Sequence, residues 1–209
     1  MEANVPVPQQ SLTITVEVNM AAAKELKAEL TKITGGSYSF TEFIVRCAAQ
    51  ALTEFKVVNS SLIDGQVLEH DTVNIGVAIA LPRGFSVPVI KDVQRKSLHA
   101  IRHDILTLAK KVHEGKLLPD ETSGGTFSVA NLGMFGVDQI TLNVHSPESA
   151  ILGICRIVNR QVVIDDAVMI QPMMNLCLSF DPQLIDSTVA AKFMSRVREL
   201  LEQPLMLLA

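Results

Sequence analysis

The chain has 209 residues, of which 48% are hydrophobic and 19% charged, and 18 Lys and Arg against 22 Asp and Glu give a formal net charge of −4. Nucleic-acid binders and proteins that bind anionic membranes need clustered Lys and Arg, which this sequence lacks, so both partner classes are excluded. The mean hydropathy of +0.30 is high for a soluble monomer and indicates apolar surface buried against other copies of the chain. The length suits one domain or two small ones.

The three cysteines, Cys47, Cys155 and Cys177, are far apart in the sequence, lie in apolar surroundings and form no C-x-x-C pair. This pattern predicts reduced core residues rather than a disulfide framework or a zinc site. The apolar stretch Val73 to Pro82 is too short to cross a bilayer, and the N-terminus has no pattern typical of a signal peptide. We therefore expect a reducing aqueous compartment, either the cytoplasm or the mitochondrial matrix.

The first half of the chain predicts a strand, two helices, a hairpin and further strands. Alternation of apolar and polar residues indicates a half-buried strand, Gly35-Gly36 ends the first helix, and Ser39 caps the second. Asp64-Gly65 is a hairpin turn signal. The expected elements are a strand over Leu12 to Val18, helices over Met20 to Ile33 and after Ser39, a hairpin over Ser61 to Glu69, a buried central strand over Val73 to Leu81 and a strand over Phe85 to Ile90.

The second half predicts a long helix capped by Ser97, mostly strand from Thr126 to Phe180, and a closing helix over Ser187 to Leu201. Strands and helices without regular βαβ alternation indicate an α/β sandwich on a mixed or largely antiparallel sheet. His99 and His103 have the i, i+4 spacing of a metal pair, but a third ligand is missing, so we interpret them as a solvated helix face. Gly124-Gly125 is interpreted as a tight turn, because the residues typical of a phosphate loop do not follow.

Three long motifs agree in order and spacing with one family. They are V-N-I-G-V-A-I-A-L-P-R-G-F-S-V-P-V-I-K-D from Val73 to Asp92, G-G-T-F-S-V-A-N-L-G-M-F-G-V-D-Q-I-T-L-N-V-H-S-P-E-S-A-I-L from Gly124 to Leu152, and the closing L-S-F-D-P-Q-L-I-D-S-T-V-A-A-K-F. Together they closely resemble the catalytic core domain of the dihydrolipoamide acyltransferases of 2-oxo acid dehydrogenase complexes. The resemblance implies a two-layer α/β sandwich like chloramphenicol acetyltransferase, with a mixed sheet, that forms trimers with active sites between subunits. Cubic or icosahedral cages are built from such trimers.

Acyl transfer from a dihydrolipoyl thiol to coenzyme A needs a base that makes a thiolate and a donor for the oxyanion of the tetrahedral intermediate. In the family the base is the His of an Asp-His-Arg-x-x-Asp-Gly motif, and the donor is the Ser of Phe-Thr-x-Ser-Asn-Leu-Gly. These motifs align without gaps on Asp181 to Ser187 and on Phe127 to Gly133. The base position is then Pro182 and the donor position is Ala130, so no intact catalytic residue is expected.

The roles of Asp186 and His145 can each be interpreted in two ways. Gln183 replaces the motif's arginine, while Asp186 is retained, either in the family's orienting role or as the N-cap of the following helix. The resemblance places His145 where the family usually has an Asn-Pro-Pro sequence. His145 is thus a possible substitute base, although a histidine before Ser-Pro is usually a surface residue.

We therefore expect residues 1–8 to be a short N-terminal extension and residues 9–209 to be an acyltransferase-like core domain. The predicted role is a non-catalytic subunit, a homotrimer or larger cage, that assembles with catalytic acyltransferase subunits. No cofactor is then required, although coenzyme A and lipoyl groups could be supplied by partner domains. The alternatives are an active acyltransferase with a repositioned base and a coenzyme A-binding protein without turnover. The apolar tail Pro204 to Ala209 is expected to pack on a neighbouring subunit.

Overall fold

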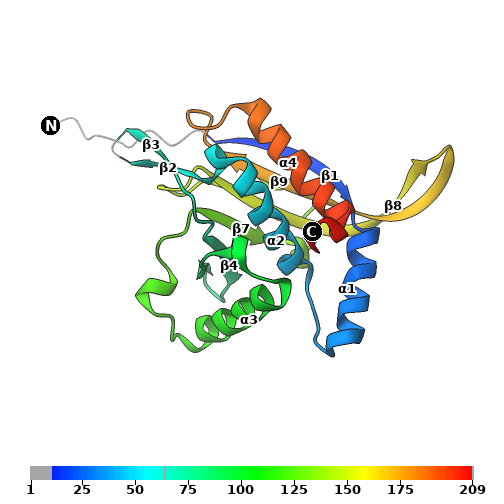
Figure 1. The fold of residues 1–209 in the computed structure, drawn as a ribbon, viewed down its shortest axis with the longest axis horizontal. Coiled ribbons are helices and arrows are strands. Elements are labelled where there is room, and N and C mark those ends of the chain that lie inside the picture. Colours follow the sequence, from blue (N-terminus) through cyan, green and yellow to red (C-terminus); the bar gives the residue numbers. More distant parts are fainter. Residues whose placement is uncertain (1–10, 64, 209) are drawn as a thin grey trace.

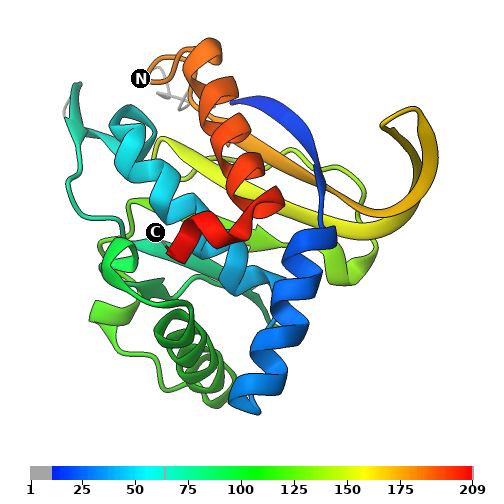
Figure 2. The ribbon, with the colours of Figure 1, turned by 45° about the vertical axis from the view of Figure 1, so that its right-hand side comes forward.

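One mixed β-sheet, covered on one face by helices, organises the computed structural model, which describes residues 11–63 and 65–208 (Figures 1 and 2). The short N-terminal extension expected over residues 1–8 lies outside the described residues. Helices α2 and α4 lie against the sheet, and α1 and α3 flank them (Figure 2). The helix bounds are α1 Ala21–Thr34, α2 Phe40–Glu54, α3 Leu98–Glu114 and α4 Ser187–Glu202.

The helix starts follow from local hydrogen bonds that the sequence predicted. The Ser39 hydroxyl accepts the Thr41 N–H at 3.2 Å, and the Glu42 carboxylate accepts the Ser39 N–H at 2.7 Å, so α2 begins with a complete capping box. Ser97 caps α3 by accepting the Ala100 N–H at 3.2 Å. Each cap pairs donors that would otherwise be unsatisfied at a helix end, which is why these boundaries are readable from sequence.

The large sheet has the order β1-β9-β8-β7-β4-β5, with β6 also paired to β4. Strand β7 runs parallel to both β4 and β8, while the other pairs are antiparallel, which confirms the predicted mixed sheet. Strands β2 and β3 form the predicted separate hairpin. The strand bounds are β1 Leu12–Asn19, β2 Ser60–Ile63, β3 Gln66–Glu69, β4 Ile75–Ala80, β5 Phe85–Ser86, β6 Val89–Ile90, β7 Phe127–Asn131, β8 Ala150–Ile164 and β9 Ala167–Phe180.

Two regions predicted as strand contain interruptions in the structure. The expected strand over Phe85 to Ile90 divides into β5 and β6, since Pro88 has no N–H to continue a ladder. The expectation of mostly strand from Thr126 to Phe180 is confirmed by β7, β8 and β9, with an interruption over residues 132–149, where Gly133–Phe135 forms a 3₁₀ turn and Gly136 adopts a left-handed φ of 80°. Residues 137–144, here called the strap, instead cross the sheet.

The two faces of the sheet differ in residue size. The helix-covered face holds the main core, in which the rings of Phe127 on β7 and Phe193 on α4 have centroids 5.9 Å apart. The opposite face, here called the open face, carries small or polar residues in register across neighbouring strands. One such row is Thr15, Cys177, Gly153, Ala130 and Ala78.

The strap lies on this open face because Gly153 leaves room for it. A Cβ atom at position 153 would lie 2.9 Å from a methyl carbon of Ile140 and 3.3 Å from one of Leu142. Backbone N–H groups contribute to tying the strap to the sheet beneath: the Arg156 N–H donates to the Val137 carbonyl (2.8 Å) and the Leu142 N–H donates to the Ser179 hydroxyl (2.9 Å).

Strand β8 has a bulge between Ile154 and Ile157. Beyond the last pair of β1 with β9, Asn19 with Met173, β8 and β9 continue as a two-stranded arm, residues 159–172 (Figure 1). The arm turns at Asp165-Asp166, both of which have positive φ. Apolar side chains near its tip are open to solvent, with Val163 70% and Ile170 71% exposed. Among the described helices, none combines the length and apolarity needed to cross a membrane.

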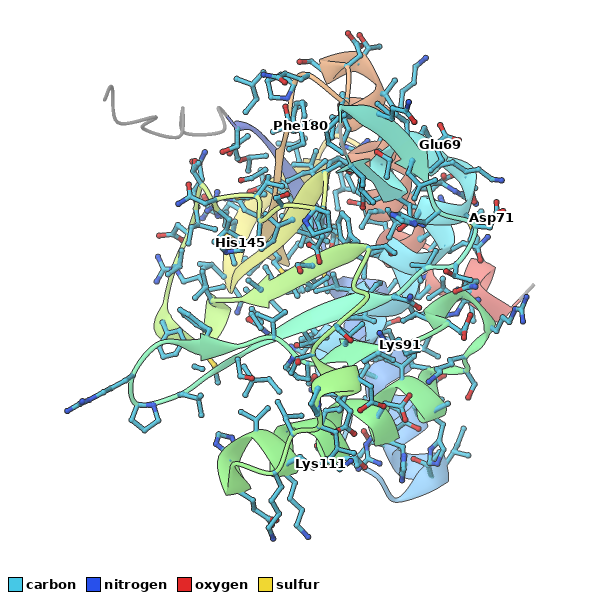
Figure 3. The ribbon with its side chains drawn as sticks, turned by 90° about the vertical axis from the view of Figure 1, so that its left-hand side faces the viewer. Glu69, Asp71, Lys91, Lys111, His145 and Phe180 are labelled. Atoms are coloured by element: carbon cyan, nitrogen blue, oxygen red, sulfur yellow. The ribbon has the colours of Figure 1, made fainter. Side chains whose placement is uncertain are left out.

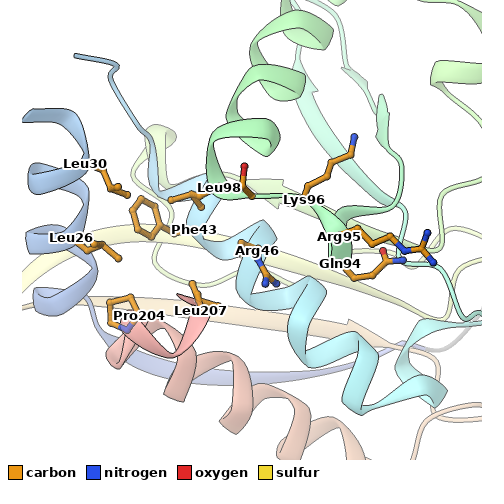
Figure 4. A pocket seen from close by; sticks show the side chains of 11 residues that line it. Leu26, Leu30, Phe43, Arg46, Gln94, Arg95, Lys96, Leu98, Pro204 and Leu207 are labelled. Carbon is orange, nitrogen blue, oxygen red and sulfur yellow. The ribbon is translucent and has the colours of Figure 1, made fainter. Parts of the chain in front are cut away.

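The C-terminal tail folds back on its own chain as a 3₁₀ turn over Pro204–Leu208. Pro204 and Leu207 line a pocket with Leu26 of α1 and Phe43 of α2 (Figure 4). Leu205, in contrast, is 68% exposed. The tail therefore covers part of the apolar surface of its own chain, while the Leu205 side chain stays exposed to solvent. The expected contact of the tail with a neighbouring subunit stays a prediction.

Candidate functional site

Ala130, which occupies the oxyanion-donor position of the family motif, lies on the open face near the carboxyl end of β7. It pairs with Ala78 of β4 on one side and with Gly153 of β8 on the other. Its methyl group packs with Val144 and Ile151 in a small apolar cluster and is 6% exposed. An alanine in such a cluster supplies shape but no hydrogen-bond donor.

The nearest polar group along the same strand face is Ser128, two residues before Ala130. Its hydroxyl donates a hydrogen bond to the Glu148 carboxylate, so it is already engaged. Burial raises the pKa of Glu148 to about 7, against a smaller lowering by that hydrogen bond. Sequence reasoning missed Glu148, because its contact with Ser128 depends on how the strap returns the chain to the sheet.

Pro182, at the position of the family's base, lies in a turn between β9 and α4. Asp181 is buried, its N–H donates to the Ser149 carbonyl at 2.9 Å, and its carboxylate accepts the Gln183 N–H at 2.8 Å. The Asp181 carbonyl accepts N–H groups from both Leu184 and Ile185. The turn is thus closed without any N–H from position 182, where the exposed proline ring supplies no titratable group.

Within one chain the structure does not bring the two motif positions together. Phe180 pairs with Ala150, whereas Ala130 pairs with Gly153 two strands away from β9. With a rise of about 3.3 Å per residue and a strand spacing of about 4.8 Å, Phe180 and Ala130 are roughly 14 Å apart. Pro182 follows beyond Phe180. A base at 182 and a donor at 130 of the same chain could therefore not touch one reacting carbon.

His145, the possible substitute base, lies on the loop that leads into β8 (Figure 3), whose first residue, Ala150, pairs with Phe180 at the end of β9. Its neighbour Val144 packs in the Ala130 cluster, so the loop does reach the donor position. The His145 side chain itself is exposed, and its carbonyl accepts the Glu148 N–H at 2.9 Å. The loop therefore packs the Val144 side chain against Ala130, while the His145 imidazole is exposed to solvent.

Asp186 is the N-cap of α4. Its carboxylate accepts the Thr188 N–H at 2.7 Å. Hydrogen bonds from the backbone at the start of α4 hold the pKa of Asp186 below its usual range. The predicted N-cap is confirmed, and it accounts for a carboxylate at this position without any catalytic role.

The other candidates are structural. The His99 ring lies 3.4 Å from the Tyr38 hydroxyl, and the His103 ring is 3.6 Å from Asp104. Among the described residues, no three His, Cys, Asp or Glu side chains gather in a way that could hold a metal ion. Gly124 takes a left-handed φ of 68° and its carbonyl accepts from the Asn74 amide at 2.9 Å, as expected of a turn.

Comparison with known proteins identifies the family of the chain. The family model of the 2-oxoacid dehydrogenases acyltransferase (catalytic domain) matches residues 2–209. The chain is 38% identical over 199 residues to the lipoamide acyltransferase component of the branched-chain alpha-keto acid dehydrogenase complex of Bacillus subtilis. That alignment covers 94% of this chain and 47% of the relative, so the chain spans about half the length of this curated relative.

Solved structures agree with the fold. The dihydrolipoamide acetyltransferase of Azotobacter vinelandii, studied for the catalytic role of a serine, a histidine and an asparagine, has a TM-score of 0.91 at 29% identity, covering 99% of this chain and 85% of that one. The cubic core of a pyruvate dehydrogenase multienzyme complex also gives 0.91, at 30% identity and the same coverage. Chloramphenicol acetyltransferase shares the fold alone, with a TM-score of 0.58 and 13% identity. The chain therefore belongs to the family of 2-oxoacid dehydrogenase acyltransferase catalytic domains.

Proposed function

We propose that this chain is a non-catalytic core subunit with a structural role in a 2-oxo acid dehydrogenase-type complex. The observation that carries the proposal is the double replacement at Pro182 and Ala130, the positions of the family's base and oxyanion donor. A general base typically contributes about 10²–10⁴-fold to a rate, and one oxyanion donor about 10²–10³-fold. Because the two groups act together, these factors are not multiplied, yet either loss alone would cripple turnover.

The surroundings of the two positions support this reading. Ala130 is enclosed by apolar side chains, and the Ser128 hydroxyl beside it is engaged with Glu148. Pro182 is exposed in a turn whose hydrogen bonds come from its neighbours. The scaffold around the former site is therefore well packed and hydrogen-bonded, while the groups that would perform proton transfer and oxyanion stabilisation are missing.

Self-association, as a homotrimer or a larger cage, is the second part of the proposal. A two-stranded hairpin is at best marginally stable by itself in water, and the arm exposes apolar side chains on Val163 and Ile170. A second copy of the chain would cover them. The solved cubic core of a relative illustrates the kind of assembly in which such a subunit could be placed. Catalytic acyltransferase subunits are the proposed hetero-partners.

The structural role requires no cofactor of its own. Coenzyme A and lipoyl groups would enter such a complex through its catalytic partners. We place the complex in a reducing compartment, the cytoplasm or the mitochondrial matrix, because all three cysteines are free and buried.

The main rival is an active acyltransferase with a repositioned base, for which Glu148 and His145 are the available groups. The discriminating experiment measures acyl-CoA formation from an acyl-dihydrolipoamide thioester by the unmodified chain, Pro182→His, Ala130→Ser and the double variant. We expect the unmodified chain to be barely above the solution rate and the double variant to exceed both single variants. Robust turnover by the unmodified chain would overturn the proposal, and its loss in His145→Ala or Glu148→Gln would identify the replacement base.

Two further measurements complete the test. Calorimetric titration with coenzyme A separates a structural subunit, which gives no binding heat, from a coenzyme A-binding protein without turnover. Light scattering at micromolar concentration reports assembly. We expect a trimer or a larger particle, and a monodisperse monomer would contradict the assembly role.

A further inference from the structure

Two of the three cysteines, far apart in the sequence, meet on the open face of the sheet. The Sγ atoms of Cys155 on β8 and Cys177 on β9 are 3.8 Å apart. Cys177 pairs with Gly153, so Cys155 is two residues further along β8 on the same face. Cys47, the third cysteine, is buried in the main core on α2, on the helix-covered face of the sheet. The structure thus contains one isolated pair of thiols.

We propose that Cys155 and Cys177 form an oxidisable dithiol site, protected by the strap, whose disulfide links β8 to β9 at the bulge in β8. A disulfide needs an S–S distance of about 2.05 Å, so each sulfur has to move by roughly 1 Å. The bulge between Ile154 and Ile157 places an extra residue in β8 at this point and leaves Cys155 outside the regular ladder. A strand irregularity of this kind can change its local geometry more readily than a fully paired strand.

The strap controls access to the pair, since Cys155 is 2% exposed and Cys177 is fully buried. Asp138 of the strap holds the Arg156 guanidinium through two hydrogen bonds of 2.7 and 2.8 Å, and its carbonyl accepts the Asn175 amide at 2.9 Å. Gln139 donates to the Thr15 hydroxyl at 3.2 Å, and that hydroxyl lies 3.5 Å from the Cys177 sulfur. The strap is therefore anchored to residues directly beside both cysteines.

The chemistry requires a small disulfide as oxidant, for which oxidised glutathione is a suitable representative. One protein thiolate attacks a glutathione sulfur and releases one reduced glutathione, and the second protein thiol then displaces the other glutathione from the mixed disulfide. The protein loses two thiol protons and two electrons, and two reduced glutathione molecules are formed. Cys155 is the first attacker in this scheme, because it is 2% exposed whereas Cys177 is fully buried.

The enclosed thiols should react slowly until the strap opens. Burial and the neighbouring Cys177 raise the pKa of Cys155 to about 12, and only the thiolate attacks a disulfide. In a reducing compartment the dithiol form is maintained, whereas an oxidising glutathione ratio would close the disulfide. The inference rests on the geometry of this pair and does not depend on the proposed structural role.

The experiment exposes the native chain to buffers of increasing oxidised-to-reduced glutathione ratio, then alkylates the remaining thiols after denaturation and measures intact mass. We expect the unmodified chain to lose two alkylatable thiols with no glutathione adduct, and Cys47→Ala to lose the same two. Cys155→Ala and Cys177→Ala should form no internal disulfide. Far-UV circular dichroism verifies that each variant is folded.

Rates test the role of the strap. Asp138→Ala, which frees Arg156, should reach the same oxidised state at least several-fold faster than the unmodified chain. Arg160→Ala is the matched control, because it breaks a comparably exposed ion pair, with Glu17, at the base of the arm rather than at the strap. It should leave the rate unchanged. The proposal is overturned if three thiols persist in both the unmodified chain and Asp138→Ala under fully oxidising conditions, if a glutathione adduct accumulates instead, or if the disulfide involves Cys47.

Discussion

The pH dependence of stability tests the surroundings of Glu148 on the open face, because the fold raises the pKa of its carboxyl from 4.5 to about 7. Burial favours the neutral acid, which can remain hydrogen-bonded to Ser128 without a desolvated charge. The folded state therefore binds this proton more tightly than the unfolded chain does. Between about pH 4.5 and pH 7, the contribution of Glu148 to the free energy of unfolding falls as the pH rises.

The size of the effect follows from the shift. With about 1.4 kcal/mol for each pKa unit, raising the pKa from 4.5 to about 7 corresponds to a loss of about 3 kcal/mol on going from pH 4.5 to pH 8. Glu148→Gln removes the charge and keeps a hydrogen-bonding side chain of the same length. We expect the variant to match the unmodified chain near pH 5 and to be about 2–3 kcal/mol more stable at pH 8.

Urea unfolding followed by circular dichroism, at fixed protein concentration and at several pH values, measures this directly. Glu29→Gln is the matched control, since Glu29 is exposed on α1. The free energy of unfolding of Glu29→Gln should fall with rising pH in the same way as that of the unmodified chain. The reasoning is refuted if Glu148→Gln keeps the same fall in stability between pH 5 and pH 8, or if the variant is less stable at every pH.

Three further predictions concern the scaffold. Asp186→Ala should lower the free energy of unfolding by about 1 kcal/mol, since the Thr188 N–H loses its acceptor, whereas Ser187→Ala, next to the cap, should have little effect in the same urea titration. Phe193→Ala should cost about 3–5 kcal/mol, because the ring is fully buried and packs against Phe127; a smaller loss in differential scanning calorimetry would show that the core can collapse around the cavity. Deleting Leu205 to Ala209 should reduce any particle larger than a trimer to the trimer, as a fully buried Leu or Met side chain contributes roughly 1.5–3 kcal/mol, and unchanged light scattering would contradict the expected role of the tail.

Local signals account for the features that sequence predicted well. The caps at Ser39 and Ser97 depend on backbone N–H groups two and three residues further on, so they are visible in the sequence alone. The hairpin around Gly65 and the N-cap at Asp186 are equally local. The break between β7 and β8 over residues 132–149 was not located from the sequence, because the strap packs on a face of the sheet and does not pair with a strand.

The contacts that define the open face could not be predicted in the same way. The pairing of Cys177 with Gly153 places Cys177 beside Cys155, although the two cysteines are 22 residues apart in sequence. Glu148 reaches Ser128 only because the strap returns the chain to the start of β8. The motif resemblance located Pro182 and Ala130, but their separation within one chain required the strand order of the sheet.

The fold explains why residues 130 and 182 could change without loss of the scaffold. It also predicts that restoring the family's residue lowers the free energy of unfolding more at position 130 than at position 182. Ala130→Ser would place a hydroxyl in an apolar cluster beside an already engaged Ser128, and burying an unpaired hydroxyl costs about 1–3 kcal/mol in proteins. Pro182→His would change an exposed residue in a turn that does not use its N–H, at a cost of about 1 kcal/mol or less from the freer unfolded chain. Urea titrations of the two single variants compare these losses directly. Equal stability of Ala130→Ser and the unmodified chain would mean that the new hydroxyl finds a partner, and the donor position would then be more polar than its packing indicates.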